Sequence, residues 1–217
     1  MNAYNGIYNR YIKRIIDLVV ILPALVIAIP IYIIIAIAII LEDGCPVFYR
    51  PLRGGYKNKS FRIYKFRTMV KNADKIGGDT TANHDPRITK VGAVLRKTKL
   101  DETANFINIL IGTMSIVGPR PELIKYTEQY EGNEKKIFQV RPGVTDFSSI
   151  EFINLDEIVG SNNADEMYEK YVLKKKNMLR IKYADSVCFT TDCKILLITI
   201  WKVYKKTIGF LFKDEHR

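Results

Sequence analysis

The chain has 217 residues and a mass of 25.0 kDa, which suffices for one packed domain with an anchor but not for two full domains joined by a membrane segment. Its 34 basic and 23 acidic residues give a formal charge of +11, which favours nucleic acid, acidic lipid or a phosphorylated substrate as partner. The three cysteines form no CxxC pair and lie far from both histidines in the sequence. This composition argues against a disulfide framework and against a zinc site.

Residues 18–41 form an apolar run without a charge, LVVILPALVIAIPIYIIIAIAIIL. The run exceeds the ~20 residues that a membrane-spanning helix needs and is too long for the apolar part of a signal peptide. Basic residues flank it on both sides, with Lys13 and Arg14 before it and Arg50 and Arg53 among those after it. Because positive charge prefers the cytosolic side, a straight crossing would satisfy only one flank.

Two prolines, Pro23 and Pro30, interrupt the run. Each removes a backbone donor and tends to kink the helix. Their seven-residue separation is nearly two full helical turns, so both bends point the same way and add. The residues predict either a re-entrant helix hairpin or an ordinary kinked spanning helix, since prolines are tolerated in membranes.

The next segments predict a small β-hairpin and a loop. Two β-prone stretches, 47–49 and 61–66, surround a Gly54-Gly55 turn signal and indicate a basic hairpin. Residues 71–90 are polar and rich in turn signals, which indicates a long loop.

Two amphipathic helices are predicted farther along the chain. The first has Leu100, Ala104, Ile107 and Ile111 at helical spacing. Near the C-terminus one apolar and one basic side follow helical spacing, with Trp201 close by, which fits either a helix in the membrane interface or a core helix with a solvated lysine face. The apolar side comprises Leu196, Ile200, Val203, Ile208 and Leu211, and the basic side Lys202, Lys205, Lys206 and Lys213.

Asp101 and Glu102 are adjacent acids at the predicted start of the first amphipathic helix. Thr98 precedes Asp101 by three residues, so the pair resembles a capping box that only stabilises the helix end. The alternative is chemical: adjacent carboxylates can share a Mg²⁺ bridged to a diphosphate while one oxygen attacks phosphorus.

Prolines and arginines are neighbours more often than composition explains. Of the six prolines outside the apolar run, five adjoin an arginine. Proline stiffens the backbone around itself, and a preset guanidinium loses less freedom when it binds phosphate. The pattern therefore favours a polyanion pocket, with rigid surface turns as the alternative. The pairs are Arg50-Pro51, Pro86-Arg87, Pro119-Arg120-Pro121 and Arg141-Pro142.

Together these motifs resemble the bacterial sugar transferase family, the small monotopic phosphoglycosyl transferases. The resemblance covers nearly the whole chain, from Lys13-Arg14 and Pro30 onward. Its further stretches are "PVFYRPLRGG", "FRIYKFRTM", "DPRITKVGAVLRKTKLDE", "GTMSIVGPRPE", "RPGVT" and "DCKILL".

The resemblance implies transfer of a sugar-1-phosphate from a UDP-sugar to undecaprenyl phosphate. UMP leaves, and a phosphosugar is held on Asp101 between the two steps. The reaction would be the first membrane step in assembly of a glycan such as a capsule, O-antigen, exopolysaccharide or glycoprotein. Asp101 and Glu102 would be the catalytic pair and would hold Mg²⁺, and Lys65, Arg96, Arg120 and Arg141 fall on positions that look like phosphate or uridine contacts.

The resemblance also implies the fold and location: a mainly helical α+β protein with a re-entrant membrane hairpin, a small β-hairpin and interfacial amphipathic helices around a cytosolic active site. Residues 1–42 would be the anchor and 43–217 the catalytic domain, monotopic on the cytosolic face of the inner membrane. Lys13, Arg14, Pro23 and Pro30 would set this topology. No nucleic acid is expected, because the anchor and lipid-facing lysines account for the basic excess.

Two positions depart from the usual family pattern: Ile29 stands where a serine often precedes the proline, and Thr113 where an aspartate is common. The sugar is not determined, although an N-acetylated hexosamine is favoured over galactose or glucose. A contrasting hypothesis is a non-catalytic, membrane-tethered basic module that binds anionic lipids or partner proteins. It gives no reason for proline-stiffened arginines beside an Asp-Glu pair.

Overall fold

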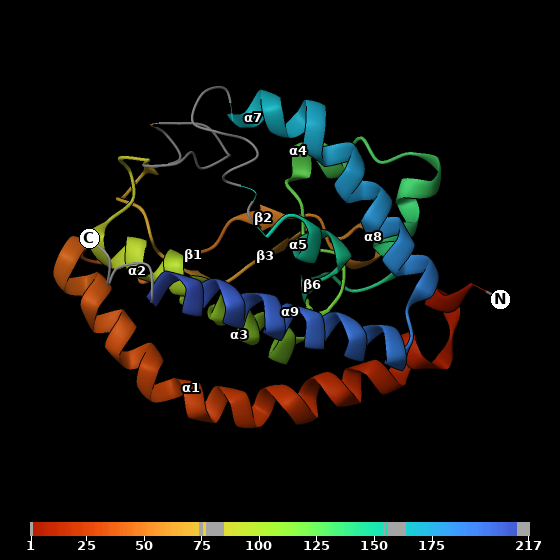
Figure 1. The fold of residues 1–217 in the computed structure, drawn as a ribbon, viewed down its shortest axis with the longest axis horizontal. Coiled ribbons are helices and arrows are strands. Elements are labelled where there is room, and N and C mark those ends of the chain that lie inside the picture. The colour runs from red at the N-terminus through yellow and green to blue at the C-terminus, as the bar shows by residue number, and fades with distance from the viewer. Residues whose placement is uncertain (1, 74–75, 77–84, 154, 156–163, 212–217) are drawn as a thin grey trace.

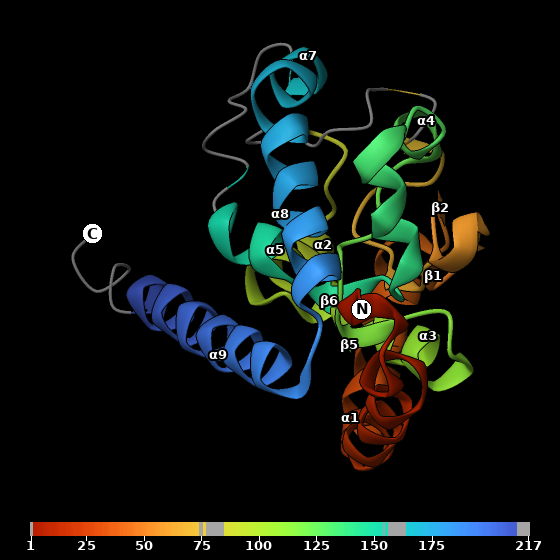
Figure 2. The same ribbon diagram turned by 90° about the vertical axis from the view of Figure 1, so that its right-hand side faces the viewer.

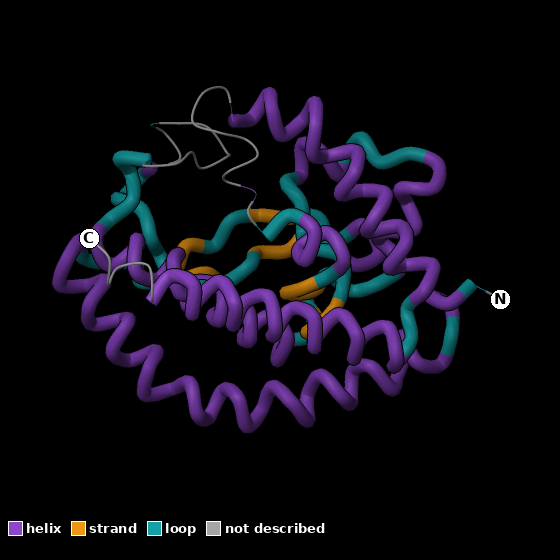
Figure 3. Tube along the Cα trace, viewed as in Figure 1, coloured by secondary structure: helices purple, strands orange, loops and turns teal. Residues whose placement is uncertain are grey.

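A computed structural model describes residues 2–73, 76, 85–153, 155 and 164–211. The described part is mainly helical, and its short strands lie at the centre among the helices (Figure 3), which confirms the predicted mainly helical α+β class. The helices are α1 (Lys13–Asp43), α2 (Lys90–Thr98), α3 (Asn105–Ile111), α4 (Ile124–Thr127), α5 (Phe147–Glu151), α7 (Ala164–Met167), α8 (Lys174–Ser186) and α9 (Phe189–Leu211). The strands are β1 (Phe48–Tyr49), β2 (Leu52–Arg53), β3 (Phe61–Arg62), β4 (Lys65–Phe66), β5 (Ser115–Val117) and β6 (Gly143–Thr145).

Tighter or wider helical turns occur between these elements. Two are wider π-type turns, η2 (Tyr8–Ile12) before α1 and η7 (Tyr168–Leu173) before α8. The 3-10 turns are η1 (Ala3–Asn5), η3 (Tyr56–Asn58), η5 (Leu100–Ala104) and η6 (Gly132–Gln139).

Helix α1 contains the whole apolar run. It passes through Pro23 and Pro30 without a break and forms one bowed helix beneath the rest of the protein (Figure 1). Each proline removes only one backbone hydrogen bond, so the helix bends and continues. Only 11 % of its most apolar stretch is buried within the protein. The apolar run is thus part of one bowed helix, and a hairpin that enters and leaves the same membrane face stays a prediction.

Both ends of α1 are fixed to the same folded body. At its start, Lys13 forms a buried ion pair with Asp192 on α9. At its end, Glu42 accepts hydrogen bonds of 2.7 and 2.9 Å from the first two backbone amides of α2, and Asp43 pairs with Arg67 at 3.2 Å. The helix is bowed between these attachments (Figures 1 and 2), and Ile21 and Ile35 on its inner side pack against the body.

The predicted β-hairpin is confirmed as two short antiparallel pairs. β1 pairs with β4, with Phe48 opposite Phe66, and β2 pairs with β3, with Leu52 opposite Arg62. Turn η3 lies between β2 and β3, after Gly54-Gly55. Most of the predicted 71–90 loop lies outside the described residues.

A third two-stranded sheet, which the sequence does not predict, is the parallel pair of β5 and β6. Ser115 lies opposite Gly143 and Val117 opposite Thr145. Just past β5 the two backbones come so close that a Cβ on Gly143 would lie 2.1 Å from the nitrogen of Gly118. Glycine is therefore required at this crossing, and the glycines of "GPRP" and "RPG" bring the two arginine-containing loops together.

Helix α9 is confirmed, but the predicted assignment of its faces is partly wrong. Ile195 and Leu196 pack into a core with α8 and the parallel strands, whereas Ile200 is exposed. Lys202, predicted on the solvated side, donates to the carbonyl oxygen of Ile150 at 2.9 Å. The outer side of α9 is apolar and includes Leu197, Ile200, Trp201 and Tyr204. The side chains of residues 206–213 lie outside the described part.

Candidate active site

Asp101 and Glu102 lie in the first turn of the 3-10 segment η5, which continues directly into α3, so helical turns run from Leu100 to Ile111. This confirms the predicted helix with the two acids at its start, and Lys99, with φ of 60°, ends α2 just before it. The capping-box interpretation is wrong, because the Thr98 hydroxyl donates to carbonyl oxygens of α2. The break between α2 and η5 presents two adjacent acids on a tight turn.

The Asp101 carboxyl group is 8 % exposed, and its Oδ1 atom has no hydrogen-bond partner among the described residues. Burial raises the pKa of Asp101, and the nearby charge of Glu102 adds to this rise, whereas the charges of Lys65, Lys99 and Arg96 offset it only partly. A buried carboxylate oxygen without a donor is costly unless a ligand uses it. Asp101 is therefore the member of the pair with an oxygen available to a ligand.

Glu102 is held by two cations. Lys65 of β4 contacts its Oε1 at 3.1 Å, and both terminal nitrogens of Arg120 bind its carboxylate, one of them at 3.0 Å from Oε2. Burial raises the pKa of Glu102, but the charges of Arg120 and Lys65 outweigh it and hold this pKa well below its usual range. Glu102 is thus a fixed anion that positions two cations beside Asp101.

Arg120 is positioned by the loop that follows β5. Its backbone N–H donates to Asp146 at 3.3 Å, and its guanidinium donates to the Val144 carbonyl at 3.4 Å. Asp146 in turn caps α5 by accepting from the Ser149 amide at 2.7 Å. These contacts, together with the prolines on either side, hold Arg120 against the dyad formed by Asp101 and Glu102.

The predicted phosphate-binding residues do not all lie together. Lys65 and Arg120 meet at Glu102, and Arg96 on α2 is near enough for its charge to lower the pKa of Asp101. Arg141 instead lies over the Tyr56 ring, with its guanidinium carbon 5.3 Å from the ring centre. Contacts thus join two of the four predicted cations, Lys65 and Arg120, to Glu102, and a third, Arg96, acts on Asp101 through its charge.

The predicted topology residues have separate local roles. Lys13 is buried against Asp192, and Arg14 donates to the carbonyl oxygens of Ile109 and Leu110 at the end of α3. Pro23 and Pro30 are both exposed on α1, which agrees with their predicted common side. At the second departure from the family pattern, Thr113 exchanges hydrogen bonds with Asn108 and helps to close the end of α3.

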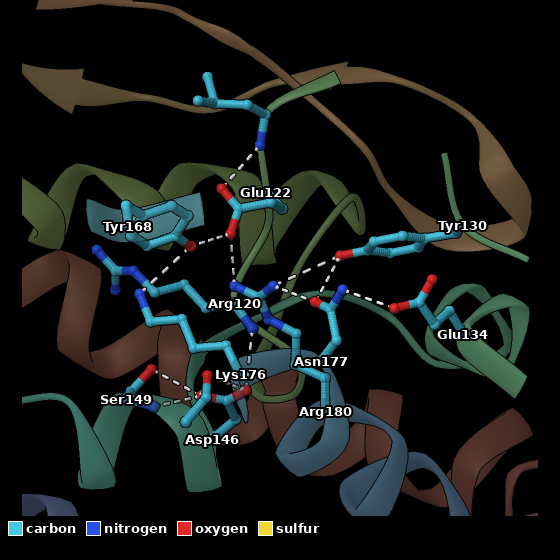
Figure 4. A network of polar contacts seen from close by, with 12 residues as sticks. Arg120, Glu122, Tyr130, Glu134, Asp146, Ser149, Tyr168, Lys176, Asn177 and Arg180 are labelled. Carbon is cyan, nitrogen blue, oxygen red and sulfur yellow. Dashed lines mark hydrogen bonds and ion pairs between the residues drawn. The ribbon is translucent and has the colours of Figure 1, made fainter. Parts of the chain in front are cut away.

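A second buried polar network lies behind Arg120 and was not predicted (Figure 4). Glu122 pairs with Arg180 at 2.8 Å and accepts from the Tyr168 hydroxyl, and Arg180 also donates to Asn177 at 2.9 Å. The charge of Arg180 outweighs the effect of burial and keeps the pKa of Glu122 below its usual range. Helical spacing in the sequence could have indicated the helix face that carries this network, which comprises Tyr168, Val172, Lys176, Arg180 and Tyr183.

The donor set fits a Mg²⁺ that is shared with a substrate. Asp101 Oδ1 is an available buried oxygen, whereas Glu102 already binds two cations. Within the described residues, no group of three or more His, Cys, Asp or Glu side chains surrounds a possible metal position. Mg²⁺ usually keeps several waters and is held by one or two carboxylates plus phosphate oxygens, which matches this arrangement.

Comparison with known proteins identifies the family of this chain. A family model described as "Bacterial sugar transferase" matches residues 8–206. The UDP-glucose:undecaprenyl-phosphate glucose-1-phosphate transferase of Escherichia coli (strain K12) is 37 % identical over 199 residues, 89 % of this chain and 40 % of that protein. The protein of the same name from Klebsiella pneumoniae is 34 % identical over 217 residues, 98 % of this chain and 43 % of its own length.

A shorter relative has a different sugar in its name. The putative undecaprenyl-phosphate N-acetylgalactosaminyl 1-phosphate transferase of Bacillus subtilis (strain 168) is 40 % identical over 132 residues, which are 61 % of this chain and 73 % of that protein. The chain thus spans about two fifths of the first two relatives and most of the third. The match over residues 8–206 shows that this chain belongs to the bacterial sugar transferase family.

Proposed function

We propose that the chain transfers a sugar-1-phosphate from a UDP-sugar to undecaprenyl phosphate and releases UMP. The observation that carries the proposal is the buried, partnerless Oδ1 of Asp101 beside a glutamate that gathers two cations. The names of the relatives support the same reaction class.

In the first step, an Asp101 oxygen forms a bond to the β-phosphorus, and the bond from that phosphorus to the bridging oxygen breaks. The electron pair leaves with UMP, and the sugar phosphate stays on Asp101 as an acyl phosphate. In the second step, a phosphate oxygen of undecaprenyl phosphate attacks the same phosphorus. The Asp101 carboxylate is released, and undecaprenyl-diphosphate-sugar forms.

The chain's residues would support both displacements through charge. Lys65 and Arg120, fixed by Glu102, would bind phosphate oxygens as negative charge moves to the leaving UMP. Mg²⁺ held by Asp101, with Glu102 nearby, would supply charge neutralisation of the diphosphate when bound.

Location at a membrane is part of the proposal. Both ends of α1 contact the body that contains Asp101, which supports a helix that enters and leaves the same face of the inner membrane, the cytosolic one. A soluble UDP-sugar and a lipid phosphate could then reach one carboxylate from opposite directions. We expect the sugar to be an N-acetylated hexosamine.

The test is UMP release from a panel of UDP-sugars with Mg²⁺ and undecaprenyl phosphate, together with intact mass after incubation without the lipid. We expect UMP and a phosphosugar adduct with the wild type, and neither with Asp101→Asn, because an amide is far less nucleophilic than a carboxylate. Unchanged turnover in Asp101→Asn would reject the nucleophile. A wild type that yields neither product with any sugar would favour a non-catalytic membrane-tethered binder.

A further inference from the structure

Lys176 is a buried lysine on α8 that the dyad chemistry does not use. It is 6 % exposed, and its Nζ makes one long hydrogen bond, 3.5 Å to the Tyr168 hydroxyl. The rings of Tyr168 and Phe152 lie 4.7 and 5.6 Å from the same nitrogen. A lysine ammonium has three donors, so two of them find no acceptor among the described residues.

The nearby acids are already engaged by other groups (Figure 4). Glu122 binds Arg180 and the Tyr168 hydroxyl. Asp146 accepts from Ser149 and from the Arg120 backbone. No salt bridge of Lys176 occurs among the described residues, so the usual structural reason for a buried lysine is missing.

Lys176 also lies near Arg120. The two side chains are neighbours in Figure 4, and Arg120 binds Glu102 directly. Burial, followed by the charges of Arg180 and Arg120, lowers the pKa of Lys176 to about 8, although Glu122 and Asp146 act in the opposite direction. A cation kept beside other cations at such cost is expected to meet an anion during function.

We propose that Lys176 is a further substrate-binding residue, whose ammonium donates to an oxygen of the sugar-1-phosphate half of the UDP-sugar. This inference rests on the proposed function. The β-phosphate is the anionic group that Asp101 must reach, and a protonated amine next to Arg120 would bind one of its oxygens or an oxygen of the attached sugar.

Lys176→Met tests the contact, because methionine keeps the length of the buried chain without its donors. Lys175→Met is the matched control at the adjacent position, where the lysine is exposed and pairs with Glu151 at 2.9 Å. We expect Lys176→Met to raise the KM for UDP-sugar by about tenfold to a hundredfold, as for loss of a charged hydrogen bond. Inhibition by UMP, which lacks the sugar-1-phosphate half, should stay unchanged, and Lys175→Met should behave as wild type.

A pH profile separates substrate binding from a purely structural role. Around Lys176, the pKa of Tyr168 is raised by burial and that of Glu122 is lowered mainly by Arg180, while Asp146, Arg120 and Arg180 are the other charged neighbours. Lys176 is therefore the group in this cluster that is expected to lose its proton near pH 8. The wild-type KM should rise as the pH passes about 8, and this rise should vanish in Lys176→Met and persist in Lys175→Met.

Two outcomes would overturn the inference: a KM unchanged in Lys176→Met, or UMP inhibition weakened as much as UDP-sugar binding. Thermal unfolding of the wild type and of each variant, measured in one detergent, reports whether the variant folds. If Lys176→Met does not fold, Lys176→Arg and the wild-type profile decide, since the charge-conserving variant should retain binding above pH 8 where the wild type weakens. A wild type without UMP release would reject the proposed function itself, before any variant is compared.

Discussion

At the scale of single residues, two adjacent carboxylates have opposite environments. The pKa of Asp101 is raised, chiefly by burial, whereas the charges of Arg120 and Lys65 hold the pKa of Glu102 well below its usual range. Such a separation assigns different roles to chemically similar groups. Glu102 remains an anion that binds two cations, and the raised pKa of Asp101 makes its carboxylate more basic, as suits the proposed nucleophile.

This difference predicts a pH dependence. Asp101 must be ionised to attack, so kcat/KM for UDP-sugar should fall as the pH decreases through a value above the ordinary range of an aspartate. Lys65→Met removes a charge that lowers this pKa, and the acid limb should therefore move to higher pH. Lys59→Met, an exposed lysine of the same hairpin, should leave the limb in place. The assignment of Asp101 as the ionised group would be contradicted if kcat/KM fell only in the ordinary pKa range of an aspartate and if Lys65→Met left that pH unchanged.

At the scale of elements, α9 has two different sides. Its inner side packs Ile195 into the core and joins Thr199 to Thr145 through a 2.7 Å hydroxyl contact. Its outer side exposes Leu197, Ile200 and Trp201, next to the lysines of the same helix. Exposed apolar residues in a row with basic neighbours are typical of helices that lie in a membrane interface.

Trp201 is the chain's only tryptophan, so its fluorescence reports this side of α9 directly. In vesicles we expect bromine attached to lipid chains to quench Trp201 strongly, and aqueous iodide to quench it weakly. In the double variant Leu197→Glu with Ile200→Glu, iodide should quench Trp201 more strongly than the lipid bromine does. The reason is that each apolar side chain transferred to the membrane contributes about 1.5–3 kcal/mol, which the charged variant loses. Strong iodide quenching in the wild type would show that α9 faces water.

At the scale of the whole molecule, α1 is a long apolar helix attached at both ends to one body. Its first turn is tied to α9 and its last turn to α2 and to Arg67. A helix that ran straight through a bilayer would place these two attachments on opposite sides. A bowed α1, as in Figure 1, is consistent with the proposed arrangement, in which the apolar middle would enter lipid while both ends stay on the side of Asp101.

Labelling from one side of the membrane tests this topology. Cys45 is exposed just after α1, and with Cys188 and Cys193 changed to serine it becomes a single reporter for that end. Asn2→Cys, in a chain that also has Cys45→Ser, reports the other end. A membrane-impermeant maleimide should label both positions from the cytosolic side. If the two positions were labelled from opposite sides of the membrane, α1 would be a spanning helix.

The sequence by itself determined the features that depend on local pattern. An uncharged run of 24 residues predicts a membrane helix, β-prone stretches around the Gly54-Gly55 turn signal predict the hairpin, and adjacency alone brings Asp101 beside Glu102. The order of the motifs also identified the family. Each of these signals extends over a few turns or a few strand residues, so no long-range information is needed.

Tertiary structure alone decided which of these groups meet. Lys65 reaches Glu102 from 37 positions away, Arg120 from 18, and Lys13 reaches Asp192 from 179. The strands β5 and β6 are three residues each, too short to give a periodic signal, and they pair only because two glycines let the backbones approach. Burial of Lys176 likewise depends on neighbours from distant segments. Local pattern therefore supplied the reactive acid, and packing chose the cations around it.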